Sequence, residues 1–143
     1  MDQLKLVALD DEDIAIVSAH VQDAVLKAAD IRWRPSEHRV VLGLDRFDWT
    51  AAHCGSPEFR RCRSALRFER VLSCKCRNLD AGKGELSLLA VAFEQTNPPG
   101  GAVRLTFAGG GELRLEVECL EIELADLGPA WVAECPPTHA VDV

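Results

Sequence analysis

The chain contains no tyrosine and a single methionine, and its six cysteines are too sparse for a disulfide scaffold. No apolar run approaches the roughly 20 residues that a membrane-spanning helix needs. The first residues carry neither the basic segment nor the apolar core of a signal peptide, and no Cys-x-x-Cys redox pair occurs. We therefore expect a cytoplasmic protein that binds no membrane and keeps its thiols reduced.

The motifs of nucleophilic catalysis are also missing. The chain has no Gly-x-Ser-x-Gly sequence and no papain-like cysteine context. The absence of tyrosine removes one common general acid or base. Paired carboxylates such as Glu116 and Glu118 lie on the solvent face of a strand by their spacing. The sequence therefore favours a non-enzymatic protein, and we expect no cofactor.

Charge is distributed unevenly along the chain. The formal net charge is −7, but residues 31–77 hold 11 basic and 5 acidic residues, whereas the rest of the chain holds 5 and 18. This layout indicates either that the basic middle segment pairs with the acidic flanking segments or that the protein has one basic face on an otherwise acidic surface. The candidate site for an anion or a partner is the basic cluster Arg60, Arg61, Arg63 and Arg67. The alternative is an exposed strand face whose arginines form salt bridges with the acidic segments. Overall acidity and only eight aromatic residues disfavour nucleic acid.

The clearest structural pattern is a pair of alternating runs. Apolar and polar residues alternate at 103–107 and again at 113–117, which predicts two strands that are each apolar on one face. Gly109 to Gly111 separate the runs and can adopt the positive φ angles that tight hairpins require. We therefore expect a β-hairpin here.

Two helices are predicted, one near each end. The N-terminal helix begins at the acidic residues Asp10 to Asp13, which favour the positive end of a helix dipole. Its apolar stripe is Ile14, Val17, Val21, Ala24 and Ala28. The C-terminal helix is predicted from the helical spacing of Leu120, Leu124 and Leu127, and Gly128-Pro129 is a strong signal for its end.

Five further strands are predicted from β-type patterns, at residues 4–8, 31–34, 40–47, 64–76 and 86–93. Residues 48–62 show no periodicity and are expected to form a long surface loop. Within the strand at 64–76, Arg70 falls on the apolar face. A buried arginine needs a carboxylate partner, so we expect either such a partner or a β-bulge that resets the register.

The predicted fold is α+β, in a single domain of residues 1–143 with an extended tail at 132–143. Its sheet is expected to be bent and antiparallel, or a partial barrel, with about seven strands and a helix near each end. This arrangement is similar to that of pleckstrin-homology-like domains. The likeness is architectural and implies no function.

Metal binding has weak support. His53, Cys54 and Cys62 provide a conceivable zinc site, but the paired Cys-x-x-Cys spacing of zinc knuckles is missing and Cys74-x-Cys76 does not replace it. We predict a metal-free protein. The leading functional hypothesis is a non-enzymatic binding or protein-interaction module, whose partner is another protein or a second copy in a homodimer. The alternative is a small enzyme or metal-dependent protein that uses the loop from His53 to Cys62.

Three segments together resemble an uncharacterised bacterial family, a domain of unknown function. They are LVALDDEDIAIVSAHVQDAV at residues 6–25, SALRFERV at 64–71 and GGGELRLEVECLEIELADLGPAW at 109–131. The resemblance covers nearly the whole chain. It implies a small, stand-alone bacterial protein, and because the family has no assigned activity it identifies no functional residue.

Overall fold

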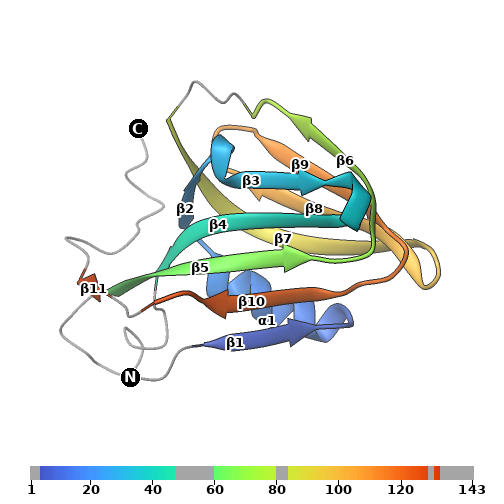
Figure 1. The fold of residues 1–143 in the computed structure, drawn as a ribbon, viewed down its shortest axis with the longest axis horizontal. Helices are drawn as coiled ribbons and strands as arrows, with labels where there is room; N and C mark the ends of the chain where they lie inside the picture. Colours follow the sequence, from blue (N-terminus) through green and yellow to red (C-terminus); the bar gives the residue numbers. More distant parts are fainter. Residues whose placement is uncertain (1–3, 48–59, 80–83, 129–130, 133–143) are drawn as a thin grey trace.

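A computed structural model describes residues 4–47, 60–79, 84–128 and 131–132. These residues form an antiparallel sheet of eleven strands with one α-helix and two short 3₁₀ helices (Figure 1). The helix α1 spans Asp11–Val21. The strands are β1 (Lys5–Ala8), β2 (Ala24–Lys27), β3 (Ile31–Arg34), β4 (Arg39–Phe47), β5 (Arg60–Phe68), β6 (Val71–Arg77), β7 (Glu85–Asn97), β8 (Gly100–Phe107), β9 (Glu112–Val117), β10 (Ile122–Asp126) and β11 (Trp131–Val132).

The sheet is bent back on itself but not closed into a barrel. The strand order is β1-β10-β5-β4-β2-β7-β8-β9-β6, with β3 paired to β4 and β11 to β5. Its two halves are a front half, β1, β10, β5, β4 and β3, and a back half, β7, β8, β9 and β6 (Figure 1). β2 joins them because it pairs with β4 and with β7.

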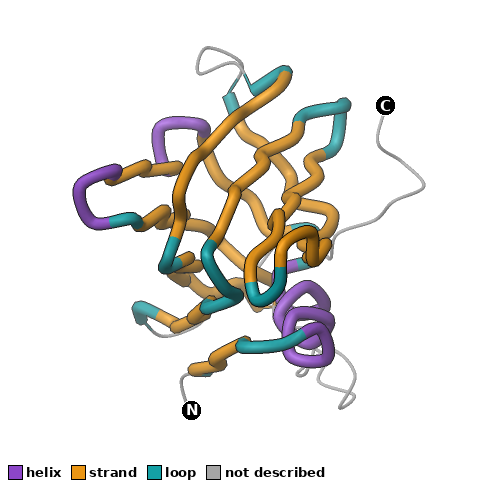
Figure 2. Tube along the Cα trace, turned by 90° about the vertical axis from the view of Figure 1, so that its right-hand side faces the viewer, coloured by secondary structure: helices purple, strands orange, loops and turns teal. Residues whose placement is uncertain are grey.

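The core lies between the two halves of the sheet. Strand alternation sends every second side chain inward, and the largest fully buried ones include Phe47, Phe68 and Phe107. Helix α1 packs against β7 and β1 and buries Ile14 and Val17. Figure 2 shows the helix beside the strand that follows the N-terminus. Each large apolar side chain buried in this way contributes about 1.5–3 kcal/mol.

Helix α1 begins as predicted but ends early. The Asp10 carboxylate accepts a hydrogen bond of 2.9 Å from the Asp13 amide, which is an N-cap contact. After Val21 the chain turns through Asp23, which has a φ of 63° and donates its amide to the Leu88 carbonyl at 2.7 Å. The predicted continuation to Ala28 is wrong because the chain pairs with β7 as strand β2.

The predicted C-terminal helix is also wrong, because residues 122–126 form strand β10. This strand pairs with β1 on one side and β5 on the other. Ile122 and Leu124 are buried, whereas Glu123 and Ala125 face outward, which is the period of two expected for a strand. The leucine that completed the helical stripe, Leu127, is 61% exposed. The predicted pleckstrin-homology-like arrangement required a helix near the C-terminal end, so this part of the prediction is not confirmed.

The single strand predicted at 64–76 is divided into β5 and β6. The chain turns at Arg70, whose φ is 60°, and passes from the front half of the sheet to the back half. Arg70 is therefore exposed rather than buried, and its Nε lies 3.7 Å from Glu121 Oε1. This division and strands β2, β10 and β11 explain why the sheet has eleven strands instead of about seven.

Other predicted elements are confirmed. The β8–β9 hairpin forms, with Gly109 and Gly110 at φ values of 86° and 92°. Strands are present at 5–8, 31–34, 39–47 and 85–97. Of the predicted loop at 48–62, residues 60–62 belong to β5 and residues 48–59 lie outside the described residues. Of the predicted tail, Val132 belongs to β11 and the rest also lies outside them.

Candidate functional site

The outer face of the front half, which points away from the core, carries a hollow of about 430 Å³. Its floor is made of small and branched apolar side chains from three neighbouring strands, Val41 on β4, Ala65 on β5 and Ala125 on β10. Gly43, Ala65 and Ala125 lie side by side in the register. Because these side chains are short, the sheet is hollowed where larger residues would fill it. We call this hollow the arginine groove.

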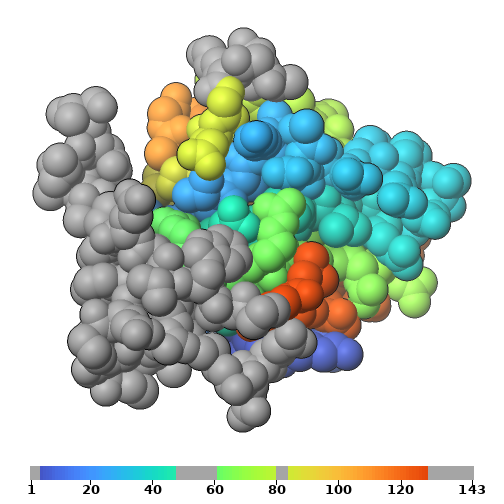
Figure 3. All heavy atoms as spheres, turned by 60° about the vertical axis from the view of Figure 1, so that its left-hand side comes forward, coloured from blue at the N-terminus to red at the C-terminus, as the bar shows by residue number. Residues whose placement is uncertain are grey.

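Four arginines form the rim of the arginine groove. Arg32 and Arg34 come from β3, Arg39 from β4 and Arg67 from β5. The antiparallel register brings them together: Arg34 is opposite Arg39, and Arg32 and Arg67 lie on either side of Val41. Residues far apart in the sequence therefore surround one apolar floor. In the space-filling view, parts of β3, β5 and β10 lie on one continuous surface (Figure 3).

Carboxylates pair with three of the four rim arginines. Arg67 Nη2 lies 3.1 Å from Glu123 Oε2, and Arg67 Nε lies 3.0 Å from Glu69 Oε2. Glu69 Oε2 also accepts a hydrogen bond of 2.8 Å from Arg39 Nε. The third pair joins Arg34 and Glu37 at 3.8 Å. Within the described part of the chain, Arg32 forms no ion pair.

A second hollow, of about 400 Å³, adjoins the groove and shares Arg39 and Arg67 with it. Its lining combines four carboxylates, those of Glu37, Glu69, Glu118 and Glu121, with the guanidiniums of Arg39, Arg67 and Arg70. His38 lies beside them, with Nδ1 3.2 Å from the Val71 carbonyl oxygen. Across the two hollows, Arg32 and Arg34 of β3 lie at one side, and Glu121 and Glu123 lie at the start of β10 on the other.

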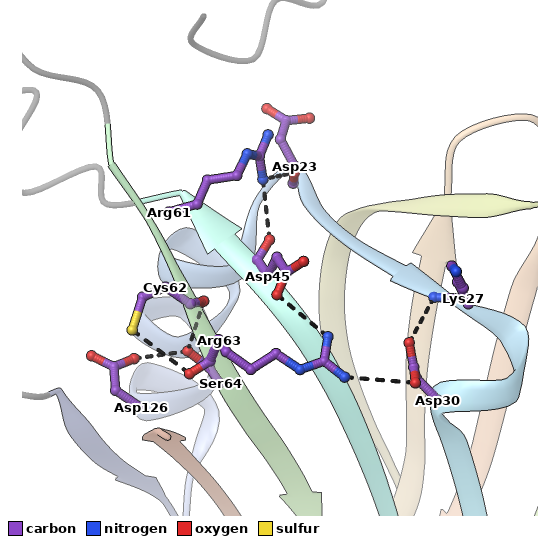
Figure 4. A network of polar contacts seen from close by, with 9 residues as sticks. All are labelled: Asp23, Lys27, Asp30, Asp45, Arg61, Cys62, Arg63, Ser64 and Asp126. Atoms are coloured by element: carbon purple, nitrogen blue, oxygen red, sulfur yellow. Dashed lines mark hydrogen bonds and ion pairs between the residues drawn. The ribbon is translucent and has the colours of Figure 1, made fainter. Parts of the chain in front are cut away.

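The predicted cluster Arg60, Arg61, Arg63 and Arg67 is divided by the structure. Arg61 donates to the backbone oxygens of Asp45 at 3.1 Å and Asp23 at 3.4 Å (Figure 4). The side chain of Arg60 lies outside the described residues. Among the arginines of this cluster whose side chains are described, only Arg67 lines the groove. Sequence reasoning missed Arg32, Arg34 and Arg39, although alternation already placed Arg32 and Arg34 on one face of a strand.

Arg63 is held by carboxylates over Gly43. Its guanidinium lies 3.3 Å from Asp45 and 3.6 Å from Asp30 (Figure 4). A Cβ at Gly43 would be only 2.7 Å from Arg63 Nη2, so the missing side chain makes room for this arrangement. Asp30 belongs to the acidic flank, as does the Glu123 that pairs with Arg67. The internal complementarity expected from the charge layout is therefore present at these two arginines.

A buried polar network on the inner face also escaped sequence reasoning. Arg46 donates two hydrogen bonds to Asp126, at 2.8 and 2.9 Å, and Ser64 Oγ donates a third at 2.7 Å. The Leu4 amide donates to the same carboxylate at 2.8 Å. Burial raises the pKa of Asp126, but these hydrogen bonds and the Arg46 charge outweigh it and lower the pKa from 3.8 to about 2. The sequence signal that could have revealed this network is that β4, β5 and β10 each carry one polar residue, Arg46, Ser64 and Asp126, at a position that faces the core.

The family model described as a protein of unknown function, DUF2948, matches residues 4–139. The chain belongs to the DUF2948 family. The whole-chain resemblance seen in the sequence is thereby confirmed, whereas bacterial origin stays a prediction. Neither the curated proteins nor the solved structures contain a match to this DUF2948 protein.

Of the two cysteines in the predicted loop of this DUF2948 protein, Cys62 is described and faces inward. Cys62 is 3% exposed, and its thiol donates to the Gly128 carbonyl at 3.1 Å. Burial, together with the nearby Asp126 charge, raises the pKa of Cys62, so it is a protonated thiol at neutral pH. His53 and Cys54 lie outside the described residues. The alternative function based on this loop therefore gains no support from Cys62.

Two further absences apply to the described parts of the DUF2948 chain. No group of three or more His, Cys, Asp or Glu side chains there is arranged to hold a metal ion. No helix in those parts is long and apolar enough to cross a membrane. A metal-free, cofactor-free protein in the cytoplasm stays a prediction.

Proposed function

We propose that this protein is a non-enzymatic interaction module that docks a carboxylate-bearing protein surface on the outer face of the front half of its sheet. The observation that carries the proposal is the arginine groove, in which an apolar floor is rimmed by four arginines. Arginine is enriched at protein interfaces because its planar guanidinium binds carboxylates in a fork geometry while its stem covers apolar surface.

The composition of the groove favours binding over catalysis. Its lining consists of arginines, apolar side chains and one carboxylate, Glu123, which is already paired with Arg67. General acid–base or nucleophilic catalysis needs a positioned proton acceptor or nucleophile. The groove lining supplies neither, so its chemistry is recognition of shape and of negative charge.

Arg32 is the best single residue with which to test the proposal. It lies on the rim, is exposed, and forms no ion pair within the described residues. Arg77, on the outer face of β6, is a matched control because it is also exposed and forms no ion pair there. Arg32→Glu and Arg77→Glu change the net charge equally but on different halves of the sheet.

The experiment measures binding of a fluorescent peptide of alternating glutamate and leucine by anisotropy, with a lysine–leucine peptide as the reverse-charge probe. We expect the acidic peptide alone to bind, and Arg32→Glu to weaken its binding about tenfold, or ~1.4 kcal/mol. Arg77→Glu should change it little, because exposed charges far from the site are screened. Equal weakening by both variants would show that the peptide senses only net charge and would overturn the proposal.

A further inference from the structure

We infer that the surface docked on this face belongs to a second copy of the same chain, packed face to face about a two-fold axis that runs along β4 and β5. The inference rests on the proposed function and names its partner. A two-fold dimer uses the same patch on both subunits, so the patch must be complementary to itself. The outer face of the front half has this property.

Self-complementarity follows from how charge changes across the strands. Arg32 and Arg34 lie on β3, at one side of the face. Glu121 and Glu123 lie at β10, on the other side. Between them lie the apolar floor of the arginine groove and the paired charges of Arg39, Arg67 and Glu69. The β3 side of the face therefore carries arginines and the β10 side carries carboxylates.

The register determines which two-fold axis matches these charges. Arg32, Val41, Arg67 and Glu123 lie in one row across β3, β4, β5 and β10. A two-fold axis parallel to the strands, between β4 and β5, places each row opposite the same row of the second copy in reverse order. Arg32 then faces Glu123 of the second copy, which is an attractive contact. An axis perpendicular to the strands would instead place each strand opposite itself, so that the β3 arginines of the two copies would repel one another.

The next row gives the same result. Arg34 is opposite Arg39 in the register, and the Glu69 amide at the end of β5 donates to the Glu121 carbonyl. Arg34 and Glu121 are therefore at opposite ends of one row, and the axis along the strands places Arg34 opposite Glu121 of the second copy. Stacked sheets lie about 10 Å apart, a gap that a pair of long side chains can bridge.

Apolar exposure on the same face points to the same occupant. Leu127 lines the groove and is 61% exposed, and Val7, opposite Glu123 in the register, is 51% exposed. Face-to-face packing about this axis removes Leu127 and the floor residues from water, whereas Val7 lies one strand beyond Glu123, on the edge strand β1. Because several of the charges on this face are already paired within the chain, we expect a weak dimer that forms as the concentration rises.

A charge swap between Arg34 and Glu121 tests the inference. Both side chains are exposed, at 54% and 42%, and their pairs within the chain are long, at 3.8 and 3.7 Å. In Arg34→Glu, both ends of the row that runs from residue 34 to residue 121 carry a carboxylate. In Glu121→Arg, both ends carry a guanidinium. Each variant alone therefore repels its own copy, whereas a mixture of the two restores both attractive contacts.

The measurement is sedimentation equilibrium of the full chain over a wide concentration range. We expect the wild type to dimerise, each single variant to weaken dimerisation at least tenfold, and the equimolar mixture to recover a heterodimer. Arg77→Glu should dimerise like the wild type. If either swap variant fails to fold, as judged by circular dichroism, Arg32→Glu mixed with Glu123→Arg applies the same test to the neighbouring row.

The outcomes separate the inference from the proposed function. Dimers that are insensitive to the swaps, or a mixture that stays monomeric, would overturn the inference because the copies would then meet elsewhere or not at all. A wild type that is monomeric throughout but binds the acidic peptide through Arg32 would leave the proposed function standing, with another acidic protein as the partner. A monomer that binds no acidic peptide would overturn both.

Discussion

The outer faces of the two halves of the sheet use the same charged residues in different arrangements. On the back half, Arg104 lies 3.4 Å from Glu112 and 3.9 Å from Glu94, and Arg114 donates to Glu116 at 2.9 Å. Each of these arginines has a carboxylate beside it on the same face, as is usual for a solvated strand surface. These pairs mix the two signs of charge along β7, β8 and β9, and Lys75 and Arg77 add two exposed basic residues on the edge strand β6.

The front half separates its charges around an apolar floor. Its arginines also form ion pairs, but Arg32 and Arg34 on β3 and Glu121 and Glu123 at β10 lie on opposite sides of the arginine groove. The two faces therefore differ in that the front face holds an apolar hollow between its β3 arginines and its β10 carboxylates. This difference is what makes the front face a candidate for docking and the back face a control surface.

The largest expected effect comes from removing the buried carboxylate that supports the front half. Arg46 and Asp126 have side chains only 6% and 4% exposed. Asp126→Ala leaves the Arg46 charge buried without this carboxylate, and breaking such a pair typically destabilises by about 3–5 kcal/mol. Urea unfolding measures the loss. A loss below about 1 kcal/mol would show that the front half does not depend on this pair.

Acid should weaken the same network, because the pKa of Asp126 is lowered to about 2 from 3.8. The carboxylate therefore stabilises the folded state fully above its unfolded pKa, and this stability is lost as the pH falls through about 2. The difference corresponds to roughly 2 kcal/mol. Unfolding free energies measured between neutral pH and pH 2 should show this component in the wild type and not in Asp126→Asn. Parallel pH profiles of the two proteins would contradict it.

Filling the floor of the arginine groove should remove docking without unfolding the protein. Ala65→Leu places a larger side chain where Val41 and Ala125 leave space, so we expect self-association or acidic-peptide binding to weaken about tenfold, or ~1.4 kcal/mol. Stability should change by no more than about 0.5 kcal/mol, because the residue faces solvent. Ala92→Leu, at an exposed position of β7, is the matched control on the back half. Equal loss in both variants would remove the distinction between the two faces.

The smallest expected effect is that of Gly43→Ala. Because the new Cβ would lie 2.7 Å from Arg63 Nη2, the guanidinium must move away from Asp30 and Asp45. Partly exposed ion pairs contribute about 0–1 kcal/mol, so the melting temperature should fall only slightly and mainly at low salt. Thermal unfolding at low and high salt measures this. A large decrease that is independent of salt would point to backbone strain instead.

Local patterns in the sequence determined the elements whose structure depends on near neighbours. The β8–β9 hairpin follows from two alternating runs and from the glycines at positive φ, and the start of α1 follows from the Asp10 cap. The basic character of residues 31–77 could likewise be read from the sequence. These features rest on backbone geometry and composition, which do not require knowledge of distant contacts.

Only the tertiary structure decided the features that depend on strand pairing. Leu120, Leu124 and Leu127 fit a helix, whereas Leu120, Ile122 and Leu124 fit a strand. The segment becomes β10 because β1 and β5 offer hydrogen-bonding edges on both sides. In the same way, Arg32 and Arg67 meet across Val41 only because β3, β4 and β5 adopt one register. A register is a relation between distant segments, so a pattern read along one segment cannot contain it.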